Sequence, residues 1–244
     1  MVAATPITAA DAPANTVATV ATVTAAAASK PPELTLRCDD ARGCPQAVGM
    51  VVFEGDPTHE RCTGTLVAPD QVLTASHCVR AADRHAGGSC ERAWVAFPDS
   101  PGAPAEWARC ERVVRASALH RTDALQQEYA LIQLARAVQR SPLTIHHEPL
   151  QPGAIVTVAS VSAHPMHDLA HALHTRLCRV MDDGAAREAL GGDGAAVGWL
   201  SDCPIERGNS GSPVLDYEGR IRAVVHGGTW TGFGRGATSE APRL

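Results

Sequence analysis

Residues 207–214 (RGNSGSPV) place Ser210 on a glycine-rich turn directly before an apolar run. Glycines allow backbone dihedral angles that residues with a Cβ atom avoid. The amide groups of Gly208 and Ser210 can then point to one side and stabilise an oxygen that becomes negatively charged during a reaction. The pattern predicts a nucleophilic serine with an oxyanion hole. An ordinary Gly-Ser turn between two strands is the alternative that this segment leaves open.

A histidine stands in a second unusual context. His77 lies next to Cys78 in the segment LTASHC, which follows the apolar run of residues 64–68. A histidine beside a cysteine at the end of a β-type run is unusual as packing alone. A serine hydroxyl is a weak nucleophile until a base removes its proton. His77 is therefore the predicted general base for Ser210.

The two segments together resemble the motifs of the trypsin-like (chymotrypsin-fold) serine endopeptidases. The histidine motif of that family reads TAAHC and its serine motif reads GDSGGP, where this chain has TASHC at residues 74–78 and GNSGSP at residues 208–213. The asparagine and the second serine are similar to the bacterial branch that includes the V8-like glutamyl endopeptidases. The resemblance covers roughly residues 45–240. It implies an all-β fold of two six-stranded antiparallel β-barrels, with the active site in the cleft between them.

The resemblance also implies a carboxylate partner for His77. The family places an aspartate directly before an apolar strand, and this chain has Glu128 before YALIQL at residues 129–134. Such a carboxylate fixes the histidine tautomer and stabilises the imidazolium. Glutamate is one methylene longer, and a displacement of about 1 Å can lower a rate by about 10²-fold. A solvated charge at a strand edge is the other interpretation of Glu128, and Asp123 is the other candidate acid.

The implied function is a serine endopeptidase that hydrolyses peptide bonds through an acyl-enzyme at Ser210. No cofactor is expected, because the chemistry is acyl transfer to water. Two features suggest the alternative of a catalytically inactive domain that binds proteins: Glu128 replaces aspartate, and the segment after Gly228 leaves no room for the family's final helix. A disulfide-bonded structural domain is a third interpretation, but it would make both motifs coincidences.

Four substrate-binding residues can be assigned by position. Pro204 stands six residues before Ser210, at the pocket floor of trypsin-like enzymes, so specificity for lysine or arginine is not predicted. Gly227 and Gly228 would let a substrate backbone pair as an extra strand. His226 resembles the histidine with which V8-like enzymes hold a glutamate side chain, although it falls one position late. It either binds an acidic side chain or only packs near His77.

Activation is expected to differ from that of the vertebrate enzymes. In those zymogens, cleavage frees an Ile-Val-Gly-Gly amine that pairs with the aspartate before the serine. This chain has no such tetrad, and Asn209 stands at the position of that aspartate. A neutral asparagine cannot form the ion pair, so this type of activation is not predicted.

Eight cysteines, an even number without a Cys-x-x-Cys pair, favour disulfides in an oxidising compartment over a zinc site. The protein is therefore expected to be secreted or extracytoplasmic. The resemblance implies the pair Cys62–Cys78, because in that family the cysteine beside the histidine bonds one on the preceding strand. The remaining pairs are expected to be Cys178–Cys203, Cys90–Cys110 and Cys38–Cys44.

Composition limits the partners. The net charge is −5 and no basic stripe is present, which argues against nucleic acid and anionic membranes. The sequence contains no run of about 18 apolar residues, which is the length needed to span a bilayer. Four histidines lie close together (His164, His167, His171 and His174), but on a strand they would not converge, and no metal is predicted. We expect a monomer that acts on protein or peptide substrates.

The elements that must position these residues are short strands. The 17 prolines and 21 glycines indicate many turns, which fits an all-β chain. The predicted strands are residues 47–53, 62–68, 72–75, 93–97, 109–116, 129–134, 154–159, 175–181, 197–201, 213–216 and 221–226, with a last strand within 232–238. Residues 37–142 are expected to form the first barrel. Residues 143–244 are expected to form the second, either naturally short or truncated. Residues 1–36 are expected to be a disordered leader, or a signal or pro segment.

Overall fold

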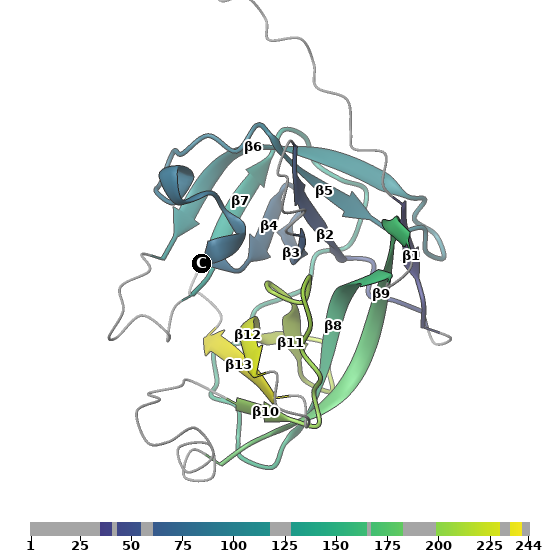
Figure 1. Ribbon diagram of the computed structural model, residues 1–244, viewed down its shortest axis with the longest axis vertical. Helices are drawn as coiled ribbons and strands as arrows, with labels where there is room; N and C mark the ends of the chain where they lie inside the picture. The colour runs from purple at the N-terminus through teal and green to yellow at the C-terminus, as the bar shows by residue number, and fades with distance from the viewer. Residues whose placement is uncertain are drawn as a thin grey trace, which may run out of the picture. The chain divides into compact units, whose positions relative to one another are not determined.

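The computed structural model describes residues 35–40, 43–54, 61–117, 128–164, 167–182, 199–229 and 235–240. These residues form thirteen β-strands and two short 3₁₀ turns, which confirms the all-β prediction (Figure 1). Asp123 and the predicted leader up to residue 34 lie outside the described residues.

The first barrel contains six strands: β2 (Val48–Phe53), β3 (Arg61–Ala68), β4 (Gln71–Thr74), β5 (Ala93–Phe97), β6 (Glu106–Ala116) and β7 (Ala130–Leu134). They close in the order β2-β3-β4-β7-β6-β5, and every pair is antiparallel. Closure leaves no unpaired sheet edge. Side chains that point inward, such as Val51, Leu66 and Ile132, form the barrel core.

The second sheet contains β8 (Ile155–His164), β9 (His167–Val180), β10 (Trp199–Ser201), β11 (Pro213–Leu215), β12 (Ile221–Thr229) and β13 (Arg235–Glu240). They follow the order β9-β10-β13-β12-β11-β8. Because β8 also pairs with β9, these six strands form a closed ring. The structure thus confirms the prediction of two antiparallel barrels.

A further strand, β1 (Thr35–Cys38), was not predicted. It pairs in parallel with β9 of the second sheet, with Thr35 opposite Ala170, although it precedes the first barrel in the sequence. Its four residues are too few, and too mixed in polarity, to be identified as a strand from their pattern. The division of the chain into two domains near residue 142 stays a proposal, consistent with the interval between the end of β7 and the start of β8.

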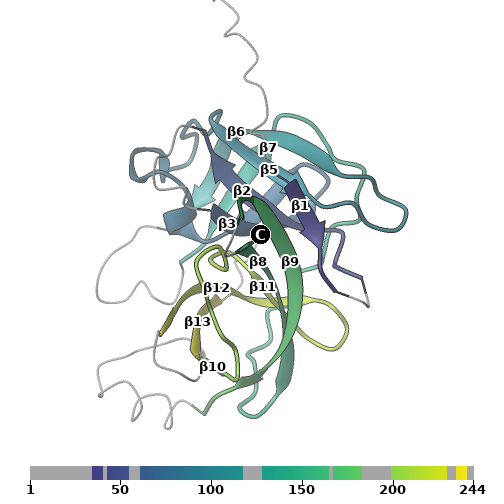
Figure 2. The same cartoon turned by 45° about the vertical axis from the view of Figure 1, so that its right-hand side comes forward.

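One hydrophobic cluster contains residues of both barrels. Strand β2 is buried on both faces, because Val51 points into the first barrel while Val48 and Met50 pack against the second. Their partners on that side are Val161 of β8 and Leu173 of β9. Strand β8 lies next to β2 and β3 in both views (Figures 1 and 2). This contact joins the barrel that contains His77 to the barrel that contains Ser210.

The four disulfides join the predicted pairs: Cys38–Cys44, Cys62–Cys78, Cys90–Cys110 and Cys178–Cys203. Cys62, His77 and Cys78 lie close enough to resemble a metal-ligand group, but both sulfur atoms are consumed by their disulfide. Among the described residues, no helix has the length and apolar character that a membrane crossing requires.

Candidate active site

Strand pairing brings His77 next to Glu128. Thr74 at the end of β4 pairs with Ala130 at the start of β7, so the residues that follow β4 meet those that precede β7. His77 lies in the 3₁₀ turn Ser76–Cys78 after β4. Its ring atom Nδ1 is hydrogen-bonded to Glu128 Oε1, and its backbone N–H donates to the same oxygen at 3.1 Å. The carboxylate therefore orients both the ring and the backbone of His77.

The second oxygen of Glu128 binds another histidine. His226 of β12 places its Nδ1 3.0 Å from Glu128 Oε2. Glu128 is only 6% exposed, so its charge depends on these two partners rather than on water. One histidine comes from each barrel, and the carboxylate links them. Packing of His226 near His77 was one of the two expectations from the sequence, but nothing in a single motif could indicate its hydrogen bond to Glu128.

The two histidines decide the charge of Glu128. Burial raises its pKa, but the hydrogen bonds from His226 and His77, together with their charges, lower it more, from 4.5 to about 2. The ionised carboxylate accepts hydrogen bonds only, so both Nδ1 atoms are donors. In the neutral ring of His77, the atom Nε2 is then unprotonated and can accept a proton. The His77 side chain is 34% exposed, so the ring is accessible from solvent.

Ser210 lies beside the disulfide that holds His77. Its carbonyl oxygen accepts a hydrogen bond from the N–H of Thr63 at 2.7 Å and lies 3.8 Å from Cys78 Sγ. In the part of the chain that the structure describes, the side chains of Ser210 and His77 do not hydrogen-bond to each other. Such bonds are often long in free enzymes and shorten when substrate binds.

Two backbone N–H groups in the turn around Ser210 have no hydrogen-bond acceptor among the described residues. The N–H groups of Asn209, Gly211 and Ser212 donate to backbone carbonyl oxygens at 3.1, 2.7 and 3.0 Å. Those of Gly208 and Ser210 donate to no atom of the described residues. These are the two amides that the sequence assigned to an oxyanion hole. An unpaired pair of donors at this turn can bind a negatively charged oxygen.

Glycine is required at two positions of this turn. Gly208 has φ +99° and Gly211 has φ +86°, in the left-handed region that side chains disfavour. A Cβ atom on Gly211 would lie 2.0 Å from the carbonyl oxygen of Thr63 and 2.3 Å from Thr74 Oγ1. The turn can therefore pack against β3 and β4 only if it carries no side chain there.

Asn209 is fully buried beneath the turn. Its Nδ2 donates to the carbonyl oxygen of Val161 at 2.7 Å, and its Oδ1 accepts from the N–H of Glu206 at 2.8 Å. Both ends of the side-chain amide thus have partners within the second barrel. These bonds hold the turn from below without an ion pair.

The predicted substrate-binding residues lie in two places. Pro204 is exposed, and its carbonyl oxygen accepts a hydrogen bond from Arg176 at 2.6 Å. Gly227 and Gly228 continue β12 beyond His226 and pair with β13. Their binding role stays a prediction.

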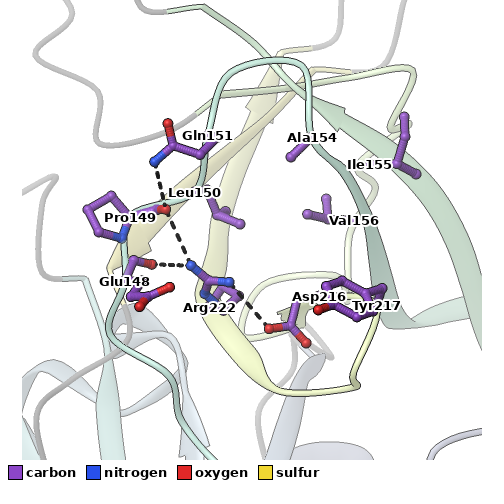
Figure 3. Close-up of a pocket in the computed structure, with 10 residues that line it drawn as sticks. All are labelled: Glu148, Pro149, Leu150, Gln151, Ala154, Ile155, Val156, Asp216, Tyr217 and Arg222. Atoms are coloured by element: carbon purple, nitrogen blue, oxygen red, sulfur yellow. Dashed lines mark hydrogen bonds and ion pairs between the residues drawn. The ribbon is translucent and has the colours of Figure 1, made fainter.

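A separate cavity of about 380 Å³ lies on the second barrel, beside the turn between β11 and β12 (Figure 3). Arg222 points into it, but its guanidinium group is engaged by Asp216 at 3.3 Å and by the carbonyl oxygens of Glu148 and Pro149. None of the candidate catalytic residues lines this cavity. It is therefore distinct from the site at Ser210.

Comparison with solved structures identifies the fold. The chain is similar to an inactivated protease paralogue, S-D1, of the scabies mite (14% identity over 80% of this chain and 86% of that chain, TM-score 0.60). It is similar to neuropsin, a serine protease of mouse brain (15% identity over 80% and 89% of the two chains, TM-score 0.58). It is also similar to a Glu endopeptidase (20% identity over 84% and 90%, TM-score 0.59). At these identities the likeness concerns the fold alone.

Comparison with curated proteins found no significant sequence match. The sequence model of the trypsin-like peptidase domain, however, matches residues 62–224, which is more than half of the chain. That range contains the histidine turn, Glu128 and the serine turn. The chain therefore belongs to the trypsin-like peptidase domain family.

Proposed function

We propose that this protein is a serine endopeptidase that hydrolyses peptide bonds through an acyl-enzyme at Ser210. The observation that carries the proposal is the hydrogen bond between His77 Nδ1 and the buried, ionised Glu128. This bond occupies Nδ1 and leaves Nε2 of His77 as the proton acceptor. His77 lies on the same turn as Cys78, whose Sγ atom is 3.8 Å from the carbonyl oxygen of Ser210. A trypsin-like peptidase domain acts on protein or peptide substrates, and no cofactor is needed for acyl transfer to water.

The proposed reaction has two steps. Ser210 Oγ attacks the carbonyl carbon of the peptide bond while His77 Nε2 takes the hydroxyl proton. The amides of Gly208 and Ser210 stabilise the oxyanion, and the proton passes from His77 to the leaving amine as the C–N bond breaks. Water then attacks the acyl-enzyme, again with His77 as the base, and releases the acid and the free serine.

Glu128 acts in this reaction by stabilising the imidazolium form of His77. A glutamate reaches His77 here because it lies two residues before Ala130, the first residue of β7, which pairs with Thr74 at the end of β4. The carboxylate binds both ring and backbone of His77, which restricts the longer side chain. This arrangement supports glutamate in the role that aspartate has in the family.

The four disulfides support a secreted or extracytoplasmic location, because such bonds persist in oxidising compartments. We propose that the protein acts there as a monomer, independently of nucleic acid or membranes. The predicted leader can be tested directly by determining the N-terminal residue of the protein exported from its native host.

The test of this function is covalent labelling of the purified, oxidised protein with a fluorophosphonate probe. We expect the wild type to be labelled, and Ser210→Ala and His77→Ala to be unlabelled, because the probe requires an activated serine. Mass spectrometry should locate the adduct on Ser210. A folded wild type that takes up no probe would overturn the enzymatic function.

The second candidate is a catalytically inactive domain that binds proteins. It is favoured by Glu128 at the family's aspartate position and by the lack of a hydrogen bond between Ser210 and His77 in the described residues. The labelling experiment separates the two functions, because only the enzyme should contain an activated serine.

We propose that a substrate backbone pairs with β12 at Gly227 and Gly228, which follow His226 in the strand, and that Pro204 forms the pocket floor. A Cβ atom on Gly227 would meet no atom within 4 Å, so the fold itself does not require glycine there. We expect Gly227→Val to leave Tm unchanged but to slow labelling by an extended peptidyl phosphonate by about 10-fold, because strand addition needs close backbone approach. Labelling by a small fluorophosphonate should stay the same. Equal losses with both probes would contradict the assignment.

A further inference from the structure

We propose that the Thr63 hydroxyl is a positioning group that holds the oxyanion hole in place and links it to both barrels. This inference deepens the function proposed above and rests on it. Thr63 follows Cys62 on β3 and is fully buried. No sequence motif pointed to it.

Four hydrogen bonds converge on this one residue. Its Oγ1 donates to the carbonyl oxygen of Gly208 at 2.8 Å and accepts from the N–H of Val161 at 2.9 Å. Its backbone N–H donates to the carbonyl oxygen of Ser210 at 2.7 Å. Its own carbonyl oxygen accepts from Thr74 Oγ1 at 2.7 Å. Thr63 thus contacts β4 of its own barrel, β8 of the other, and the turn that carries Ser210.

Two of these contacts hold the peptide groups that flank the amide of Ser210. Thr63 binds the carbonyl oxygens of Gly208 and Ser210, which lie on either side of Asn209. Asn209 is itself held from the other side by Val161. Because a peptide group is planar, fixing these carbonyl groups fixes the planes of the 208–209 and 210–211 peptide groups, and the peptide group that carries the Ser210 N–H lies between them.

The Thr63 hydroxyl also accepts a hydrogen bond from a backbone N–H of β8 that pairs with no neighbouring strand among the described residues. Strand β8 pairs with β11 only at Thr157 and Val158, so the edge of β8 is open where it reaches Val161. There the N–H of Val161 donates to Thr63 and its C=O accepts from Asn209. Buried backbone groups need such partners. The turn that carries Ser210 is therefore hydrogen-bonded both to β3 of the first barrel and to the unpaired edge of β8 in the second.

The chain offers a matched control two residues along the same strand. Thr65 is also a buried threonine on β3, 1% exposed, but its hydroxyl has no hydrogen-bond partner among the described residues. Replacing either threonine by valine removes one hydroxyl and keeps the shape. Only Thr63→Val should disturb the turn.

The experiment measures fluorophosphonate labelling as a function of probe concentration. We expect Thr63→Val to lower the maximal labelling rate by about 10²-fold, as loss of an oxyanion donor does, with the half-saturating probe concentration changed by less than about 3-fold. Thr63→Ser, which keeps the hydroxyl, should retain the rate within about 5-fold, and Thr65→Val should match the wild type. A Thr63→Val protein as fast as Thr65→Val would overturn the inference.

Hydrogen exchange provides a readout that needs no activity. Backbone amides of residues 206–212 should exchange faster in Thr63→Val than in the wild type or Thr65→Val, because the turn loses its hydrogen bond from the Thr63 hydroxyl. If the wild type takes up no probe, the proposed function fails, and this comparison alone decides the role of Thr63. Unchanged exchange would then overturn it. Thr63→Ala serves for both measurements if the valine variant does not fold.

Discussion

Replacing Glu128 by glutamine is expected to lower kcat by about 10⁴-fold, the loss seen when the acid of a serine protease triad becomes an amide. An amide presents both an N–H donor and a C=O acceptor, whereas His77 and His226 each need an acceptor at Nδ1. One of the two rings must then change its tautomer. If His77 changes, the proton moves to Nε2 and the base is removed; if His226 changes, His77 still loses the negative charge that stabilises its imidazolium. Steady-state kinetics on a peptide substrate, or labelling rates, would measure the loss.

Glu106→Gln is the matched control, since Glu106 pairs with Arg136 on the first barrel and contacts neither histidine. It should keep the wild-type rate. Activity of Glu128→Gln within about 10-fold of the wild type would exclude Glu128 as the working acid. Asp123 would then be the residue to replace next.

The same substitution has a pH signature in the free energy of unfolding. The pKa of Glu128 is lowered in the folded protein from 4.5 to about 2, so its ionised form favours folding. This contribution is fully present above pH 4.5 and is lost as the pH falls towards 2. The stability difference between wild type and Glu128→Gln should therefore shrink on acidification over that range. Urea unfolding at several pH values would measure it.

The second large effect is expected from Asn209→Asp, which restores the aspartate of the vertebrate motif. The new carboxylate would be fully buried and would face the carbonyl oxygen of Val161, to which Asn209 now donates. Burial of an unpaired charge at this position should cost about 3–5 kcal/mol of unfolding free energy at pH 7. Chemical denaturation of both proteins would measure the difference.

The pH dependence of this loss has a defined sign. Burial and the facing carbonyl oxygen raise the pKa of the introduced aspartate above its unfolded value of about 3.9. The protonated carboxyl can donate to Val161, so the loss should shrink as the pH falls towards that value and grow as the pH rises. Equal stability of the two proteins at pH 7 would show that another group compensates the charge. An N-terminal amine, as in the activated vertebrate enzymes, would be the first to examine.

Much of this protein could be predicted from local patterns. Short apolar runs between turn residues predicted most of the strands at least in part, from β2 to the β12 strand that begins at Ile221, because strand formation depends partly on neighbours along the chain. The paired motifs around His77 and Ser210 indicated the family, and the family indicated Cys62–Cys78. Strand β1 was not predicted, because its four residues of mixed polarity carry no strand pattern. Its pairing with β9 depends on the tertiary structure, which places these distant segments side by side.

Local sequence specifies which residue types stand at the serine and histidine turns, where glycines allow a left-handed backbone, and that the eight cysteines could pair. The tertiary structure decided which partners those residues meet. Glu128 acquired a second histidine on β12, and Thr63 acquired three contacts with chain segments about 100 to 150 residues away. Contacts of this kind join segments that are distant along the chain, so no local pattern encodes them. They exist only once the two barrels have packed against each other.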